Sequence, residues 1–447
     1  METIRTGRTI LWWVALGFVL RLCARLYTGE ADFWANGYRF YFAMAQNISA
    51  GNGIGFNGGP PTAFRVPLYP ILIALLTWGR PLFLPVLFAQ ALIGAGTVWC
   101  AAWLAGEMFS SRAAVTAAAL TAVYPYYVVH DTALQETGLF TLLTAVSVIL
   151  LLRTQKGGSG GVAVCAGLAL GADVMTRSTI APFAVFAPVL LISLGAGTLK
   201  ARLRVALLCA GALVLTVSPW LARSYRLTGV PTLSTETGFQ VWNGNNPYTF
   251  SHYPAESMDL SVTAAFDAMS AGDKARLEKL RANEAVRDRW FLQKGVEYIR
   301  AHPWLSVANG FRKLGAAFGW LMSPRRSFWP SLVHALSYGP VMALGMWGMW
   351  TRRSHWREDA IIYAVFVAFA AVTWVCFAHT SHRSYLDVYW IVFAAGRTES
   401  LRRKYLPQLR FVFFPPELKN VSRETFASET PSNVTVFRKF AQILCAT

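Results

Sequence analysis

Residues 205–222, VALLCAGALVLTVSPWLA, contain no Asp, Glu, Lys or Arg, and about 20 apolar residues cross a bilayer core as a helix. Four further stretches of the 447-residue chain also lack these residues: 81–106, 178–199, 327–351 and 360–382. Only 14% of residues are charged, against roughly a quarter in soluble proteins. The pattern predicts an all-α integral membrane protein. It excludes a soluble enzyme, a secreted disulfide scaffold, a disordered chain and an outer-membrane barrel.

The order of the chain follows from the apolar stretches. Backbone groups in lipid must be bonded within their own segment, so each span is expected to be a helix. The segments 66–79 and 304–322 are expected to lie at the interface. Lys and Arg in the short loops place the N-terminus inside, so loops 28–66 and 224–304 face outside. Ten spans are predicted: 8–27, 82–106, 113–131, 137–153, 160–176, 178–197, 205–223, 331–350, 359–378 and 384–397.

The net charge of +18 is expected to reflect cytoplasmic loops and phosphate-facing cations rather than nucleic acid, because no nucleic-acid-binding motif is present. Residues 1–397 are predicted to form one membrane domain, and residues 398–447 a polar cytoplasmic tail. No pair of the six cysteines has the spacing of a metal site.

The first outer loop carries candidate catalytic groups. Glu30 and Asp32 are carboxylates at the mouth of the membrane domain, where a carboxylate can take a proton from a hydroxyl group. Arg65 can hold a phosphate through its planar fork of donors. Tyr41 and Tyr69 accompany them. From the residues alone, a solvated loop with interfacial aromatic side chains is the favoured interpretation of this pattern, because carboxylates are common in loops.

Two further sets of charges lie near the outer ends of spans. Asp131 and Glu136 lie between the third and fourth spans. Ionisable residues at this depth are functional candidates, and the alternative is a pair of interfacial acids that only ends a helix. Asp173 and Arg177 are four residues apart, so on a helix they would share a face and pair. Arg177 could still reach a lipid phosphate.

The second outer loop is introduced by Ser218-Pro219-Trp220 and Arg223. Pro219 is expected to kink or end its helix, which would place Arg223 among the headgroups. Gly and Asn clusters usually mark tight turns, which is one interpretation of Asn245 and Asn246. The remaining candidates are Lys313 at the end of this loop, and His379 and Arg383 between the last two spans.

Together these segments resemble the membrane-embedded GT-C glycosyltransferases, in the branch of bacterial protein mannosyltransferases and aminoarabinose transferases. The resemblance covers roughly residues 10–397. It rests on the following segments: Tyr41 with Asn47–Gly53, Ala63–Pro70, Leu134–Phe140, Thr176-Arg177, Ser218–Arg223 with Gly244–Pro247, His302-Pro303 with Lys313, and Arg383.

The resemblance implies a bundle of about ten to thirteen transmembrane helices with interfacial helices in the outer loops. It implies transfer of a sugar from a polyprenyl-phosphate carrier to a lipid, glycan or protein acceptor on the outer face of the inner membrane. Asp32, Glu30 or Glu136 would be the base. No metal and no cofactor are expected, because a donor of this kind has no diphosphate for a divalent ion to bridge. The donor phosphate would be held by Arg65, Arg177, Arg223, Lys313 and Arg383, and substrate by Tyr41, Tyr69, Asn245, Asn246 and His379.

One position departs from the family. The family's catalytic Asp lies about four residues before the tyrosine that aligns with Tyr41, and here that position is Gly37. The nearest acids are Asp32 and Glu30, so either the loop is shifted or the base is missing. The competing interpretations are a transporter or flippase of a lipid-linked saccharide and a surface-glycan ligase or polymerase. Ionisable groups clustered at one face favour chemistry over transport.

Overall fold

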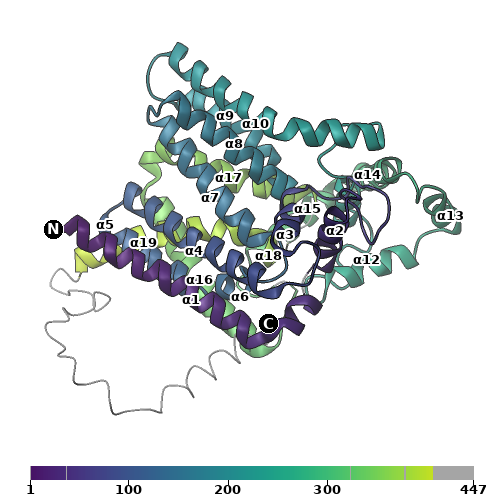
Figure 1. Ribbon diagram of the computed structural model, residues 1–447, viewed down its shortest axis with the longest axis horizontal. Coiled ribbons are helices and arrows are strands. Elements are labelled where there is room, and N and C mark those ends of the chain that lie inside the picture. Colours follow the sequence, from purple (N-terminus) through teal and green to yellow (C-terminus); the bar gives the residue numbers. More distant parts are fainter. Residues whose placement is uncertain (1, 37, 323, 377–378, 406–447) are drawn as a thin grey trace.

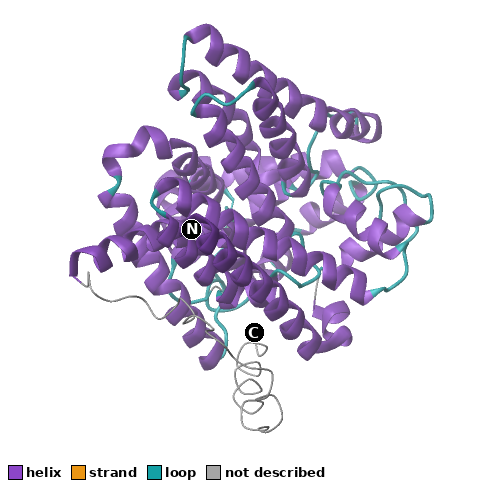
Figure 2. Cartoon of the chain, turned by 60° about the vertical axis from the view of Figure 1, so that its left-hand side comes forward, coloured by secondary structure: helices purple, strands orange, loops and turns teal. Residues whose placement is uncertain are grey.

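The computed structural model describes residues 2–36, 38–322, 324–376 and 379–405, and most of the predicted tail 398–447 lies outside these residues. The described part consists of helices joined by loops, of which the one at 50–67 is long (Figures 1 and 2). An all-α membrane protein is thereby confirmed. Five segments are long and apolar enough to cross a membrane: Thr6–Ala35 in α1 (Glu2–Asn36), α4 (Phe83–Met108), α7 (Thr137–Gln155), α10 (Leu199–Thr228) and Arg353–Val375, which contains α17 (Trp356–Val375).

Shorter apolar helices complete the bundle, and the number of spans stays a prediction. They are α3 (Leu68–Thr77), α5 (Ser111–Val123), α8 (Gly160–Thr176) and the segment Ser178–Leu194, which contains α9 (Ala181–Leu194). Helix α16 (Phe328–Thr351) and helix α19 (Asp387–Tyr405) also belong to the bundle.

Two of the predicted helix boundaries are wrong, both at prolines. The segment 113–131 is two helices, α5 and α6 (Pro125–His130), because Tyr124 is extended and Pro125 starts the second helix. Helix α10, in contrast, passes through Pro219 and ends only at Gly229, where φ is +74°. Pro219 cannot bond the Leu215 carbonyl, which instead accepts a hydrogen bond of 3.4 Å from the Ser218 hydroxyl.

Helix α19 lies in the core of the bundle, although the predicted span 384–397 is short and carries Asp387. Its apolar side chains from Val388 to Phe393 are almost wholly buried. Helix α16 packs closely against it, because a Cβ on Gly348 would lie 2.4 Å from the Phe393 carbonyl oxygen. Close packing through small residues is a common way for membrane helices to associate.

The second outer loop folds into short helices at one end of the bundle, on the right in Figure 1 next to α2 (Arg39–Ser49) and α3. Aromatic side chains of Trp242, Trp290 and Phe291 form a small core among them. Most of helix α15 (Pro303–Phe318) lies in the predicted interfacial segment 304–322, and its Trp304 side chain is 84% exposed. The helices are α11 (Thr237–Asn243), α12 (Met258–Asp267), α13 (Ala271–Lys279), α14 (Glu284–Ala301) and α15 (Pro303–Phe318).

Candidate functional site

Glu136 and Arg177 form a buried ion pair where two helices meet. Glu136 immediately precedes α7, and Arg177 immediately follows α8. Arg177 Nε lies 3.7 Å from Glu136 Oε1, and the Glu136 side chain is only 5% exposed. The guanidinium also lies 5.5 Å from the centre of the Phe140 ring. Glu136 Oε2 makes no well-formed hydrogen bond with any described residue, although the Tyr41 side chain lies within hydrogen-bonding reach of the carboxylate.

The predicted pairing of Asp173 with Arg177 is wrong. Helix α8 ends at Thr176, and Arg177 is extended with φ −152° and ψ 114°, so it leaves the helical face that it would share with Asp173. Asp173 Oδ1 instead accepts a hydrogen bond of 3.2 Å from the Thr144 hydroxyl inside the bundle. The end of the helix therefore releases Arg177 toward Glu136.

Tyrosines from the first outer loop enclose this carboxylate. The Tyr41 and Tyr69 rings meet edge to face at 4.9 Å, and the Tyr38 amide donates to the Leu134 carbonyl at 2.8 Å. Burial raises the pKa of Tyr41 well above its usual value, and the negative charge of Glu136 raises it further. The same pKa is lowered by Arg65 and Arg177. Tyr41 therefore lies among the charges of all three groups.

Arg65 supplies a second cation next to this group. Its Nε lies 3.0 Å from Glu236 Oε2, and its side chain is 31% exposed, which makes it more accessible than Arg177. Burial raises the pKa of Glu236, and Arg65 opposes that rise. Burial lowers the pKa of His379 to about 4, so its imidazole is neutral at pH 7, and the positive charge of Arg177 also lowers this pKa.

Arg223, predicted to hold phosphate, supports the loop that carries Arg65. Its guanidinium donates to the Thr62 carbonyl at 3.0 Å and to the Ile54 carbonyl at 3.1 Å, and it lies over the Trp220 ring. On the other side of the loop, Glu284 accepts a hydrogen bond of 2.7 Å from the Ala63 amide. These bonds fix the backbone immediately before Arg65.

Lys313 and Asn245 bond the backbone at the end of α17. The ammonium group of Lys313 donates to the carbonyls of Gly244 and Val375 at 3.2 Å each, and Asn245 Nδ2 donates to Val375 at 2.6 Å. Asn246 closes the same turn by donating to the Trp242 carbonyl at 2.9 Å. The turn interpretation of the two asparagines is therefore confirmed. Substrate contact by these residues stays a prediction.

Arg383 lies in a separate buried cluster. Its Nε is 3.4 Å from Asp387 Oδ1, both side chains are fully enclosed, and the guanidinium stacks 3.5 Å from the centre of the Tyr338 ring. Tyr124 donates to the other oxygen of Asp387 at 3.0 Å. In this conformation the protein itself surrounds Arg383, so a donor phosphate has less access to it than to Arg65.

The acids of the first loop lie at the end of α1. Arg25 Nη1 lies 2.9 Å from Asp32 Oδ2, and the Asp32 side chain is 35% exposed. Glu30 is exposed and accepts a hydrogen bond of 3.1 Å from the Trp34 indole. The position that departs from the family, Gly37, lies outside the described residues.

Sequence analysis missed the partner of Asp131, which is Arg21 on α1 at 2.8 Å, with both side chains buried. Arg21 also donates to the Gly17 carbonyl at 2.9 Å. Gly94 has no side chain and so leaves room for the pair, because a Cβ there would lie 2.3 Å from Arg21 Nε. Asp131 is thus held away from Glu136, which leaves Glu136 as the carboxylate among the tyrosines.

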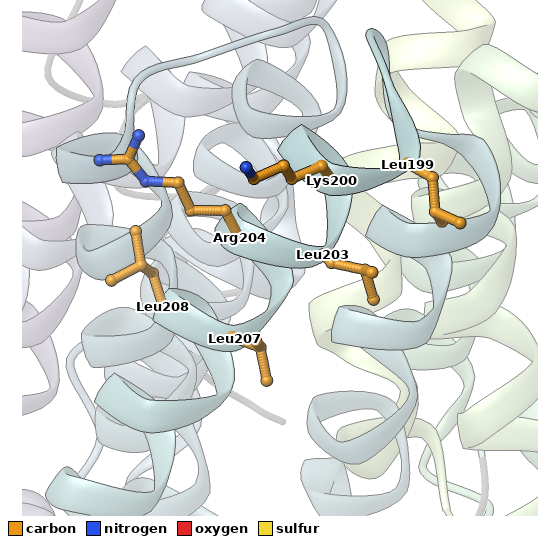
Figure 3. Close-up of a pocket in the computed structure, with 6 residues that line it drawn as sticks. All are labelled: Leu199, Lys200, Leu203, Arg204, Leu207 and Leu208. Atoms are coloured by element: carbon orange, nitrogen blue, oxygen red, sulfur yellow. The ribbon is translucent and has the colours of Figure 1, made fainter.

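A shallow hollow of about 640 Å³ lies on α10, well away from this group (Figure 3). Leu203 in its lining precedes Arg223 by 20 residues on the same helix, which corresponds to about 30 Å of α-helix. The hollow is therefore not part of the candidate site, which comprises Glu136, Arg177, Arg65, Glu236, Tyr38, Tyr41 and Tyr69.

Comparisons with known proteins agree with this fold. Residues 65–222 match the model of a family described as dolichyl-phosphate-mannose-protein mannosyltransferase. The archaeal oligosaccharyltransferase AglB from Archaeoglobus fulgidus, solved in complex with an inhibitory peptide and a dolichol-phosphate, is similar with a TM-score of 0.50 and 15% identity. That match covers 98% of this chain and 54% of AglB. The predicted GT-C resemblance is confirmed. The chain spans about half the length of AglB.

Other comparisons add less. The apo form of the Archaeoglobus fulgidus oligosaccharyltransferase has a TM-score of 0.51 and 14% identity, covering 88% of this chain and 51% of that chain. ArnT from Cupriavidus metallidurans bound to undecaprenyl phosphate has a TM-score of 0.38 and 13% identity, over 89% of this chain and 80% of ArnT. A comparison with curated protein sequences gives no match. The family match spans Arg65, Tyr69, Glu136 and Arg177, four members of the candidate site.

Proposed function

We propose that this protein is a membrane glycosyltransferase that moves a sugar from a polyprenyl-phosphate carrier to a lipid, glycan or protein acceptor. The observation that carries the proposal is the Glu136–Arg177 pair, which lies among tyrosines and beside Arg65 within the stretch that matches the family. One carboxylate and two cations suit the transfer of a sugar from a phosphate, which needs a base and a stabilised leaving group.

The two arginines are paired with carboxylates before a donor binds. Arg177 pairs with Glu136, and Arg65 pairs with Glu236, so neither buried cation is left uncompensated. A donor phosphate would compete for both guanidinium groups through bidentate hydrogen bonds. As Arg177 turns to the phosphate, Glu136 is released and can accept a proton. Donor binding would thus prepare the base for the reaction.

The reaction would be a single displacement with inversion. The acceptor oxygen forms a bond to the anomeric carbon while the bond from that carbon to the phosphate oxygen breaks. Glu136 takes the acceptor proton, and the bonding electron pair leaves with the polyprenyl phosphate, whose charge Arg177 and Arg65 stabilise. Glu136 is favoured over Asp32, because Asp32 pairs with Arg25 outside the tyrosine group. The base and the two cations in this scheme are side chains of the protein.

The setting of the reaction is part of the proposal. We place the protein in the inner membrane with ten or more spans and the site on its periplasmic or outer face. The support is the distribution of Lys and Arg between short and long loops. The transferred sugar in this scheme is a hexose or a pentose.

The test is release of polyprenyl phosphate by the purified protein in nanodiscs, with a panel of radiolabelled polyprenyl-phosphate sugars and acceptors. We expect release from at least one donor, with label appearing in the acceptor. Glu136→Gln should slow release by about 10²–10⁴-fold, the usual effect of removing a general base. Glu278→Gln on the exposed helix α13 is the matched control and should retain the wild-type rate.

The alternatives give different results in the same assay. Slow release by Asp32→Asn with normal release by Glu136→Gln would move the base to the first loop. Donor that binds and crosses the bilayer without cleavage would identify a transporter or flippase. Transfer of a preassembled glycan alone would identify a ligase or polymerase.

A further inference from the structure

The hollow on α10 is lined by one helical face of leucines and two basic residues (Figure 3). Leu203 and Leu207 are one turn apart, and Lys200, Arg204 and Leu208 follow the same four-residue spacing. Leu199, Leu203 and Leu207 are exposed, and Leu208 is partly buried, on a helix that is long and apolar enough to cross a membrane. In Figure 3 the nitrogen-bearing ends of Lys200 and Arg204 lie on the same side of the helix. The hollow therefore combines an apolar floor with two positive charges.

Neighbouring basic residues at this end of the bundle have protein partners. Lys156 pairs with Glu107 at 2.6 Å, Arg352 pairs with Asp359 at 2.8 Å, and Arg202 donates to the Ile192 carbonyl at 2.9 Å. These groups share one end, because the Gln155 side chain donates to the Arg357 carbonyl and the Gln155 carbonyl accepts from the Ala196 amide.

Lys200 and Arg204 differ from these neighbours. Within the part of the chain that the structure describes, neither forms an ion pair or a side-chain hydrogen bond. Two unpaired cations next to exposed leucines at the end of a span complement a negatively charged headgroup with acyl chains below it. Topology alone would require positive charge here, but it would not require these two charges to remain without partners beside a hollow.

We infer that this hollow binds an anionic phospholipid of the leaflet opposite the candidate catalytic site. Lys200 and Arg204 hold the phosphate, and Leu203, Leu207 and Leu208 contact the acyl chains. The site lies about 30 Å along α10 from the Arg223 end, so it is separate from the proposed donor site. The inference does not depend on the proposed catalytic activity, and its test measures binding without turnover.

The experiment titrates the purified full chain in detergent with dioleoyl phosphatidylglycerol or dioleoyl phosphatidylcholine, with lipid-bound protein measured by native mass spectrometry. We expect tighter binding of phosphatidylglycerol. Replacing both cations, Lys200→Gln with Arg204→Gln, should weaken it by about 30-fold, since each charge near a lipid headgroup contributes about 1 kcal/mol. The matched control removes two exposed charges elsewhere, Arg226→Gln with Lys279→Gln, and should bind as the wild type does.

Three results of the lipid titration would overturn the inference. The wild type could bind both lipids equally, the Lys200/Arg204 variant could keep its preference, or the control variant could lose as much affinity as the test variant. A soluble arm with glycerol phosphate separates a headgroup site from a lipid site. Binding of glycerol phosphate as tight as that of the phospholipid would show that the leucines contribute nothing, which also contradicts the inference.

Discussion

At the scale of single residues, the ion pair between Arg21 and Asp131 lies inside the apolar bundle, with both side chains buried. Removing one partner would leave the other charge buried and uncompensated. We predict that Asp131→Ala lowers the free energy of unfolding by about 3–5 kcal/mol, measured by unfolding in detergent. The double variant Arg21→Met with Asp131→Leu should recover most of that loss. A single variant as stable as the wild type would contradict this account.

Lys313 gives a prediction with a sign in pH. Burial lowers its pKa to about 8, whereas the unfolded chain keeps the ordinary value of 10.5. Between these pH values the unfolded state binds more protons, so the Lys313 contribution to stability rises as pH rises from 8 to 10. As the pH rises over this range, we expect the Tm of the wild type to rise relative to the Tm of Lys313→Met. A constant difference in Tm would show that Lys313 does not titrate there.

The roles of these residues were only partly predictable. Glu136 and Arg177 stand out in the sequence because each is charged and lies next to the end of a predicted span, and Arg65 because it immediately precedes the predicted interfacial segment 66–79. Their partners do not, because ion pairs such as Arg21 with Asp131 join residues 110 positions apart. The predicted pairing of Asp173 with Arg177 fails for a local reason. Arg177 is the first residue after α8, and its extended backbone takes it off the helical face of Asp173.

At the scale of elements, the turn that starts at Gly244 fixes the end of α17. A Cβ on Gly244 would lie 2.0 Å from the Cys376 carbonyl oxygen, so any side chain there must displace the backbone that leads to His379. We predict that Gly244→Ala lowers stability by about 1–3 kcal/mol, the usual cost of overpacking, and reduces donor turnover.

The control for this prediction is Gly211→Ala. Gly211 lies on α10, and a Cβ there would meet no atom within 4 Å. It should leave Tm and turnover unchanged or slightly improved, because alanine favours helix. Equal effects of the two substitutions on Tm would indicate that close packing at Gly244 is unimportant.

Helix positions were predictable from apolar runs, whereas helix ends were not. Residues 82–106 and 137–153 were expected as spans, and α4 and α7 occupy them closely. Proline had opposite outcomes at two positions, because Pro125 follows an extended tyrosine while Pro219 has Ser218 to satisfy the freed carbonyl. Side-chain compensation of this kind is not visible in a hydropathy pattern.

At the scale of the whole molecule, the account places the two long loops on one side of the membrane and the α9–α10 loop on the other. We predict that a cysteine replacing Glu278 on α13 reacts with an impermeant maleimide from the outer side. A cysteine replacing Ala196 should react only after permeabilisation. The background lacks the six natural cysteines. Labelling of both positions from the same side would contradict the topology.

The candidate site is assembled from segments that are distant in the sequence. Arg65, Glu136, Arg177 and Glu236 come from four loops, and the apolar pattern does not specify how their helices pack. The resemblance assigns the donor phosphate to Arg223 and Lys313 and substrate to Asn245, and these assignments stay predictions. The structure gives each of those three side chains backbone carbonyl partners.

The central claim is that Glu136 is the base and Arg177 holds the donor phosphate. The measurement that tests it most directly is donor affinity together with the single-turnover rate of polyprenyl phosphate release, for the wild type, Glu136→Gln and Arg177→Ala. We expect Glu136→Gln to bind the donor at least as tightly as the wild type, because Arg177 then has no competing carboxylate, but to release polyprenyl phosphate about 10²–10⁴-fold more slowly, while Arg177→Ala loses both binding and release. Release by Glu136→Gln at the wild-type rate would contradict it.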